Sequence, residues 1–159
     1  MDNDMKSFEY WFDFGSPAAY LAFTQLQKLE ADTNSKAVYR PMLLGGVFQA
    51  TGNQSPASVP AKGAYTFKDF DRFAKRYGVP FNSNPYFPIN TLLLMRGAIG
   101  MQQKEPERFL VYCKAVFQAI WVEALNMNDP ATVGAVLHNA GFDPQSLMTL
   151  ANETPIKEA

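Results

Sequence analysis

The sequence predicts an α/β protein in which a strand–helix–strand unit is followed by a mainly helical body. Phe8 to Phe14 is a short, aromatic-rich run, which is typical of a buried strand. The turn Gly15-Ser16-Pro17 leads from this run into an apolar series at helical spacing. Beyond Pro41 the periodic segments are helical, so helix is expected to outweigh strand.

Ser16 and Pro17 mark the start of the first helix. Serine is a preferred N-cap because its side-chain oxygen accepts a backbone N–H, and proline suits the first helical position, where no N–H is needed. The helix is predicted to span Ala18 to Ala31. Lys36 to Pro41 is a second strand candidate, so the first part of the chain is predicted to form a βαβ unit.

Turn signals and two helices are predicted in the middle of the chain. Leu44 to Ala50 indicates a short helix within a region, Gly45 to Pro60, that is rich in Gly, Asn, Ser and Pro. Ala61 to Tyr77 is amphipathic, with aromatic residues along one stripe. Gly78 is expected to end this helix in the left-handed conformation.

The last part of the chain is predicted to be entirely helical. Two of these helices open with Asp followed by Pro, which is the same kind of start signal as Ser16-Pro17. Another is apolar outside one narrow polar face, so it is expected to be mostly buried. The predicted helices are Thr91–Gln103, Glu107–Leu125, Pro130 to near Gly141, Pro144 to about Asn152, and one that begins at Thr154.

Length and composition limit the classes of function. The 159 residues suit one domain, and 47% hydrophobic against 18% charged residues allows a sizeable core. The net charge is −1, which gives no electrostatic footprint for nucleic acid. There is no run of about 18 apolar residues for a membrane span, and the polar start is unlike a secretory signal. We therefore expect a cytoplasmic protein with no nucleic-acid or membrane partner.

The chain has one cysteine, Cys113, and one histidine, His138. This excludes an internal disulfide, a CxxC redox pair and a metal site built from several Cys or His residues. Cys113 lies within the most apolar helix, so we expect a buried structural thiol. His138 is near a helix C-terminus and is interpreted as structural. No metal site is predicted.

Ser16 is the first candidate for chemistry, and two interpretations are open. A serine hydroxyl has one donor and two acceptor sites, so Ser16 can cap the helix as an acceptor and still donate its proton to an anion. If that anion is a thiolate, the donated hydrogen bond lowers the pKa of the thiol. The alternative is that Ser16 is only a cap. Asp13 either orients the turn before Ser16 or is an acid at a strand end.

Five segments together resemble one enzyme family across essentially the whole chain. They are residues 10–22 (YWFDFGSPAAYLA), 40–53 (RPMLLGGVFQATGN), 59–62 (VPAK), 76–81 (RYGVPF) and 84–91 (NPYFPINT). The chain is thereby identified as similar to the 2-hydroxychromene-2-carboxylate isomerase / kappa-class glutathione transferase family.

The resemblance implies a thioredoxin-like fold with a large helical insertion of the DsbA type. The implied domains are residues 1–44 for the thioredoxin-like βαβ half, 45–152 for the helical insertion and 153–159 for the start of the return to the first domain. The closing ββα half of that fold is absent from the sequence, so we interpret the chain as a C-terminally truncated family member. Domain swapping or a homodimer would then complete the two-stranded sheet, which is marginal by itself.

The resemblance also implies a cofactor and a reaction. Glutathione is the cofactor, and its thiolate adds reversibly to a conjugated aromatic substrate so that a double bond isomerises, as in the catabolism of aromatic compounds. A kappa-like transferase or peroxidase is the alternative with the same thiolate. A catalytically silent family member that keeps a pocket or a dimer surface is the third hypothesis.

Residue by residue, the resemblance makes Ser16 catalytic, in contact with the glutathione sulfur. It places Pro17, Asn53, Pro60 and Lys62 at the glutathione as well. Asn53 and Lys62 also have structural interpretations, as a turn residue and as a solvated lysine in the first turn of a helix, whereas Pro60 is expected to make backbone contacts.

Asn90 matches a substrate-pocket position in the family, although a structural role for this residue is equally open. Gln49 is a second predicted substrate residue and departs from the family, because relatives often carry Lys there. A cation for a substrate carboxylate is then missing. Ala18 and Ala19 also depart from an aromatic residue and Ser, which widens the space beside the sulfur.

Overall fold

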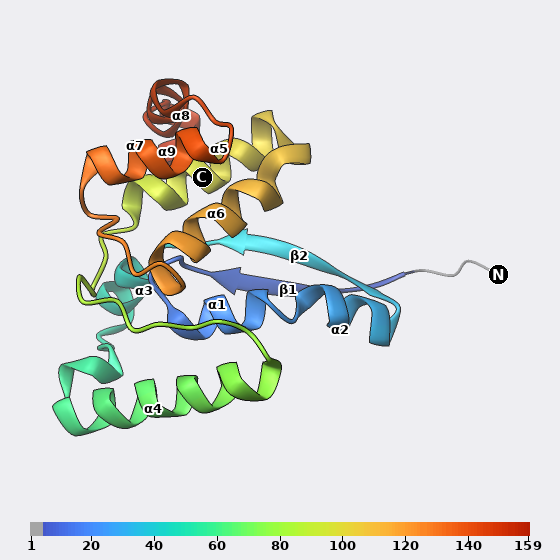
Figure 1. Ribbon diagram of the computed structural model, residues 1–159. Coiled ribbons are helices and arrows are strands. Elements are labelled where there is room, and N and C mark those ends of the chain that lie inside the picture. Colours follow the sequence, from blue (N-terminus) through green and yellow to red (C-terminus); the bar gives the residue numbers. More distant parts are fainter. Residues whose placement is uncertain (1–4) are drawn as a thin grey trace. The chain divides into compact units, whose positions relative to one another are not determined.

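The computed structural model describes residues 5–159 and contains two parallel strands and a series of helices (Figure 1). Two compact units are present. The first holds the described residues up to Phe12 together with Ser16–Pro80, and the second holds Asp13–Gly15 and Phe81–Ala159. Residues 1–4, which belong to the predicted first domain, lie outside the described residues. The division at residues 44 and 152 stays a prediction.

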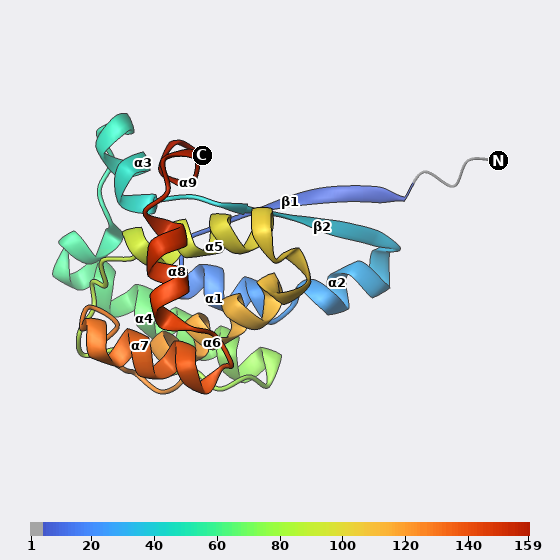
Figure 2. The ribbon, with the colours of Figure 1, turned by 90° about the horizontal axis from the view of Figure 1, so that it is seen from above.

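The first unit is built on a parallel pair of strands. β1 (Lys6–Phe12) pairs with β2 (Ser35–Pro41), with Lys6 opposite Ser35. Side chains alternate along β1, so that Tyr10 and Phe12 are buried while Trp11 is exposed. Stacking holds the two buried rings 5.1 Å apart between centroids. The Tyr10 hydroxyl donates to the carbonyl of Ala19 at 2.6 Å, which ties the buried face of the sheet to α1 (Figure 2).

The predicted first strand, Phe8 to Phe14, is displaced by two residues, because β1 begins at Lys6 and ends at Phe12. β1 ends at Phe12 rather than Phe14 because the chain turns at once. The Asp13 carboxylate accepts a hydrogen bond from the backbone N–H of Gly15 at 2.8 Å, and this local contact replaces strand pairing. An aromatic run alone does not reveal that its last member lies in a turn.

The predicted helix over Ala18 to Ala31 is in fact two helices, α1 (Pro17–Phe23) and α2 (Leu26–Thr33). The Thr24 hydroxyl donates to the Leu21 carbonyl at 2.6 Å, and the N–H of Gln25 turns back to Ala22 at 2.9 Å. Such a side-chain bond competes with the helical pattern. The break therefore follows from Thr24, a residue that apolar periodicity does not weigh.

Three more helical elements complete the first unit. They are α3 (Leu44–Thr51), the 3₁₀ turn η1 (Pro56–Ser58) and α4 (Pro60–Tyr77). Gly78 ends α4 with φ at 67°, as predicted. α4 packs against α1, and the Tyr20 hydroxyl donates to the Pro80 carbonyl at 2.5 Å.

The second unit is helical. Its elements are α5 (Leu92–Lys104), the 3₁₀ turn η2 (Pro106–Arg108), α6 (Phe109–Trp121), α7 (Pro130–Asn139), α8 (Pro144–Ala151) and α9 (Thr154–Glu158). α6 is the buried helix that the sequence predicts, and Cys113 within it is fully buried. Burial raises the pKa of the Cys113 thiol far above its ordinary value, so this group is protonated and unreactive.

α6 ends four residues before the predicted end at Leu125. The carbonyls at its C-terminus accept hydrogen bonds from a loop that precedes α5 in the chain. The N–H of Asn82 donates to the Trp121 carbonyl at 2.7 Å, and the Asn84 amide donates to the carbonyls of Ile120 and Leu125 at 3.0 and 2.9 Å. These contacts satisfy the final turn of the helix and bend the chain away.

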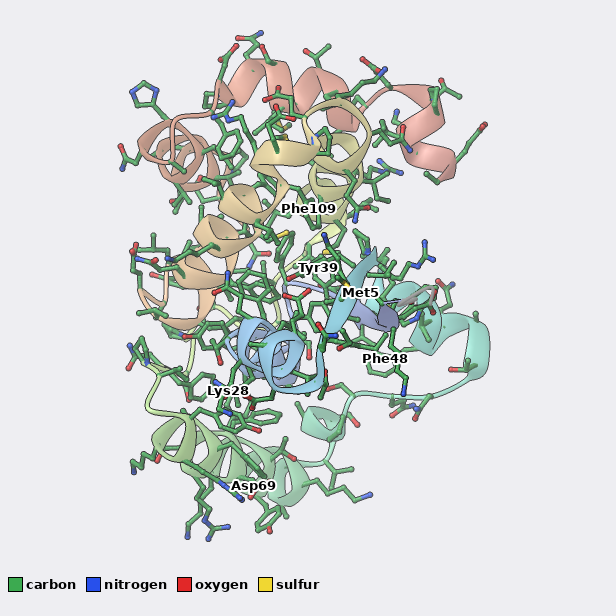
Figure 3. The ribbon with its side chains drawn as sticks, turned by 90° about the vertical axis from the view of Figure 1, so that its right-hand side faces the viewer. Met5, Lys28, Tyr39, Phe48, Asp69 and Phe109 are labelled. Carbon is green, nitrogen blue, oxygen red and sulfur yellow. The ribbon has the colours of Figure 1, made fainter. Side chains whose placement is uncertain are left out.

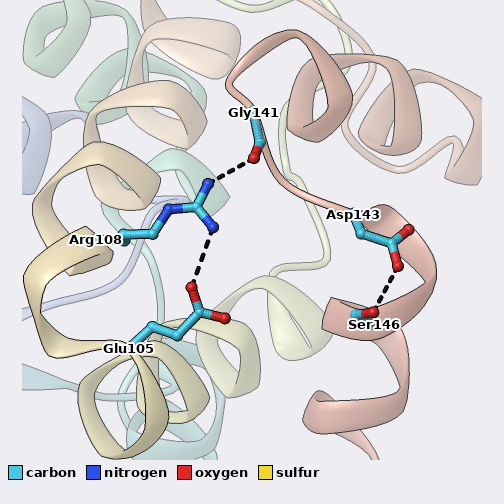
Figure 4. A network of polar contacts seen from close by, with 5 residues as sticks. All are labelled: Glu105, Arg108, Gly141, Asp143 and Ser146. Atoms are coloured by element: carbon cyan, nitrogen blue, oxygen red, sulfur yellow. Dashed lines mark hydrogen bonds and ion pairs between the residues drawn. The ribbon is translucent and has the colours of Figure 1, made fainter.

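Side-chain hydrogen bonds fix the ends of α7 and α8. Figure 4 shows Arg108 donating to the Glu105 carboxylate at 3.1 Å and to the Gly141 carbonyl at 2.6 Å. In α8, the Ser146 hydroxyl donates to Asp143 at 2.5 Å, and this bond, together with backbone N–H donors, lowers the pKa of the Asp143 carboxyl. The Asp-Pro starts of both helices are confirmed.

We predict that Gly97→Ala destabilises the protein. A Cβ at Gly97 would lie 2.3 Å from the hydroxyl of Tyr112, and this buried ring cannot move away because its hydroxyl also donates to Leu94 at 2.8 Å. The free energy of unfolding should fall by about 1–3 kcal/mol in urea denaturation. Gly134→Ala is the matched control, because its Cβ would meet only Pro144, at 4.0 Å, and should be neutral or stabilising. An unchanged midpoint for Gly97→Ala would contradict this account.

Candidate functional site

Ser16 caps α1 as predicted. Its backbone is extended (φ −95°, ψ 115°), and its Oγ accepts the N–H of Ala19 at 3.1 Å. Pro17 occupies the first helical position. This contact uses the hydroxyl oxygen as an acceptor, and the hydroxyl proton is chemically free to be donated elsewhere. Ser16 can therefore cap α1 through its oxygen and still donate its hydroxyl proton to an anion.

The turn directly before Ser16 is held by buried contacts within the second unit. The Asp13 carboxylate is buried and accepts from both the Gly15 N–H and the Thr91 hydroxyl, the latter at 2.6 Å. The Phe14 carbonyl accepts the indole N–H of Trp121 at 2.8 Å. Asp13 thus orients the turn, which was one of the two interpretations left open by the sequence.

Gln49 and Asn53 lie on and after α3. Gln49 is exposed in the last turns of this helix. Asn53 follows Gly52, whose φ of 67° ends the helix, and it bonds the Phe48 carbonyl through its own N–H at 3.1 Å. The Asn53 Oδ1 accepts from Gln54 at 2.8 Å. Asn53 therefore has a visible turn role and keeps its amide N–H groups for a ligand.

Pro60 and Lys62 lie in the first turn of α4, and both are exposed. Pro60 is the first helical residue, where its missing N–H costs nothing. None of the ion pairs found among residues 5–159 involves Lys62. Its ammonium group is accordingly suited to an anion from solvent.

These residues gather at one end of the first unit. Figures 1 and 2 agree that α3 and the start of α4 lie at the end where α1 begins, which is also where the two strands finish. The N–H of Met42 donates to the Phe12 carbonyl at 3.0 Å and closes the strands there. Figure 3 shows Tyr39 on β2 and Phe48 on α3 as landmarks of this region. The carboxyl end of parallel strands is a common ligand site.

Asn90 belongs to the second unit, where it precedes α5 and is exposed. Its Oδ1 accepts from Leu92 at 3.2 Å, and its backbone N–H donates to the Asn128 side chain at 2.8 Å. Sequence reasoning missed Asn128, as it missed Thr91 beside Asp13. Asn128 is 38 residues from its partner Asn90, and Thr91 is 78 residues from its partner Asp13. No local sequence pattern links either pair.

Metal and nucleophile alternatives find no support among residues 5–159. No group of three His, Cys, Asp or Glu side chains in this part of the chain is placed to hold a metal ion. Cys113 is buried and protonated. No helix in the same range has the length and apolarity needed to cross a membrane.

Comparison with known proteins gives consistent matches. A sequence model described as the DSBA-like thioredoxin domain matches residues 8–159. The chain is 31% identical over 138 residues to a 2-hydroxychromene-2-carboxylate isomerase of Pseudomonas putida, covering 85% of this chain and 66% of that protein. It is 29% identical over 119 residues to glutathione S-transferase kappa 1 of Caenorhabditis elegans, covering 71% of this chain and 53% of that protein.

A solved structure of a 2-hydroxychromene-2-carboxylate isomerase matches with a TM-score of 0.80 at 25% identity, covering 96% of this chain and 74% of that one. The predicted resemblance and the predicted DsbA-like fold are both confirmed. The chain spans between about half and two thirds of the length of the two curated relatives above (53% and 66%).

Proposed function

Because the chain belongs to the DSBA-like thioredoxin domain family, we propose that it is a glutathione-dependent enzyme in which Ser16 is the catalytic residue at the glutathione sulfur. The observation that carries this proposal is the Ser16 hydroxyl, which caps α1 through its oxygen at 3.1 Å and retains a proton to donate. The transferases among its relatives are named for glutathione.

The residues at this end of the first unit fit such a cofactor. When bound, glutathione supplies a thiol that acts as a nucleophile once deprotonated. Ser16 donates a hydrogen bond to the sulfur and so favours its charged form. Lys62 offers an ammonium group to a carboxylate, and Asn53 offers amide N–H groups. Pro17 and Pro60 keep the two helix starts in place.

The reaction that we propose first is isomerisation of a 2-hydroxychromene-2-carboxylate type of substrate, with Gln49 and Asn90 as substrate-binding residues. An aromatic substrate, a role in aromatic catabolism, a cytoplasmic location and a homodimer belong to the same proposal. Three isomerases among the relatives support the reaction.

One observation favours a second candidate, a kappa-like transferase. The exposed Gln49 on α3 offers a neutral amide, so this position has no cation for a substrate carboxylate. A neutral electrophile needs no such cation. The third hypothesis, a catalytically silent chain, differs from both enzyme candidates in making no use of glutathione.

We predict that the protein binds glutathione. Isothermal titration with glutathione in the millimolar range should give saturable heat, which Lys62→Gln should weaken through loss of the ammonium group. Lys68→Gln is the matched control, because Lys68 is an exposed lysine on the same helix, α4. Absence of heat from the wild-type protein would refute both enzyme proposals.

We predict that Ser16→Ala shifts the pH–rate profile to higher pH. Loss of the donated hydrogen bond disfavours the thiolate, so the pKa of the bound thiol rises by about 1–2 units, and the rate near neutral pH falls about tenfold or more. Ser16→Thr, which keeps the hydroxyl, should retain the profile. The lost cap alone should cost about 1 kcal/mol of stability, so denaturation curves separate misfolding from lost chemistry. An unshifted profile would show that Ser16 is only a cap.

We predict that Gln49→Lys raises kcat/KM for 2-hydroxychromene-2-carboxylate relative to a neutral electrophile such as 1-chloro-2,4-dinitrobenzene. An added ammonium group would attract the carboxylate of the first substrate only, by roughly 1 kcal/mol or about fivefold. Ala50→Lys carries the same charge on the neighbouring exposed position and is the control. Equal effects of the two variants on both substrates would remove Gln49 from the substrate site.

A further inference from the structure

The second unit contains a large apolar cavity. Its volume is about 1120 Å³, and it is lined by α5, α7, α8 and the loop before α7. Sites that hold small molecules are typically roughly 300–1,000 Å³ and mostly apolar. The principal apolar side chains of the lining are Leu93, Val133, Leu137, Leu147 and Met148.

Part of this lining is exposed to water. Leu93 and Met148 are each 40% exposed, although both are large apolar side chains on the cavity wall. Removing such surface from water is the main source of affinity for an apolar ligand. The cavity is therefore open to a ligand as well as large enough for one.

The charges in the lining select against anions. Glu153 is the one carboxylate in it, and none of the lining residues is Lys, Arg or His. The Tyr112 hydroxyl is held neutral, because burial raises the pKa of this phenol and the group donates to Leu94. An anionic ligand would face Glu153 with no cation to balance it, whereas a neutral ligand meets no such cost.

A hydrogen-bond donor lies at the edge of the cavity. The Asn90 Oδ1 is occupied by the Leu92 N–H, so its Nδ2 group is the part that can serve a ligand, as a donor. The Asn128 Oδ1 next to it already accepts from the Asn90 backbone. A ligand carbonyl or ether oxygen suits this arrangement.

We propose that the second unit has a binding site of its own for a neutral, largely apolar small molecule that presents a hydrogen-bond acceptor to Asn90. The site is formed entirely by residues of this unit. Asn90 is also a substrate-binding residue of the proposed function, but binding at this site needs neither glutathione nor Ser16, so its failure would leave the chemistry proposed at Ser16 standing.

The probe is Nile red, a neutral apolar dye with a carbonyl group, added to the full chain in the absence of glutathione. We expect saturable binding at one dye per chain, with a blue-shifted emission. Gly134→Leu should weaken the affinity at least tenfold, because Gly134 lines the cavity and a leucine side chain there would occupy part of the space that the ligand needs. Gly134→Ala, whose Cβ meets only Pro144 at 4.0 Å, should bind like the wild type.

Two comparisons test the chemistry of the site. The anionic dye 8-anilinonaphthalene-1-sulfonate should bind at least tenfold more weakly than Nile red. Asn90→Asp, which keeps the acceptor for Leu92 but loses the amide donor, should weaken Nile red severalfold. The proposal is overturned if Nile red binds without saturation, or if Gly134→Leu binds it as well as Gly134→Ala does. It is also overturned if the anionic dye binds as well as the neutral one. Light scattering that shows the protein self-associating, with Nile red dissociating the complex, would overturn it too, because the cavity face would then be a contact between copies of the chain.

Discussion

The buried carboxylate of Asp13 is the contact on which the arrangement before Ser16 depends. One oxygen accepts both the Gly15 N–H at 2.8 Å and the Thr91 hydroxyl at 2.6 Å. A buried carboxylate requires such partners, and a donor left without one would cost about 1–3 kcal/mol. The strand therefore ends where Asp13 turns the chain, and Ser16 follows in the extended conformation that a helix cap needs.

The need of buried polar groups for hydrogen-bond partners also shapes the second unit. No buried side-chain nitrogen or oxygen among residues 5–159 lacks a hydrogen-bond partner. The Trp121 indole, the Asn84 amide and the Tyr112 hydroxyl each bond a backbone carbonyl from a distant part of the chain. Polar groups are thus placed among apolar helices at little cost, and the cavity between those helices keeps a mostly apolar lining.

Ser16 and the cavity represent two kinds of chemistry in one chain. The first is a hydroxyl at a helix start, in the same unit as exposed groups such as Lys62 that suit a polar, charged ligand. The second is an apolar space with a single carboxylate, Glu153, which suits a neutral molecule.

The sequence by itself determined where α1, α7 and α8 begin, because their start signals are local. Ser16-Pro17, Asp129-Pro130 and Asp143-Pro144 each cap a helix at the predicted residue through contacts two or three positions away. Five segments of sequence also sufficed to identify the family. The end of α6 and the support of Asp13 were decided by tertiary structure: Asn84 satisfies the end of α6 from 36 residues away, and Thr91 supports Asp13 from 78 residues away. A carbonyl or carboxylate accepts a hydrogen bond from the donor that the folded chain places beside it. Residues so far apart in the sequence become neighbours only when the chain folds.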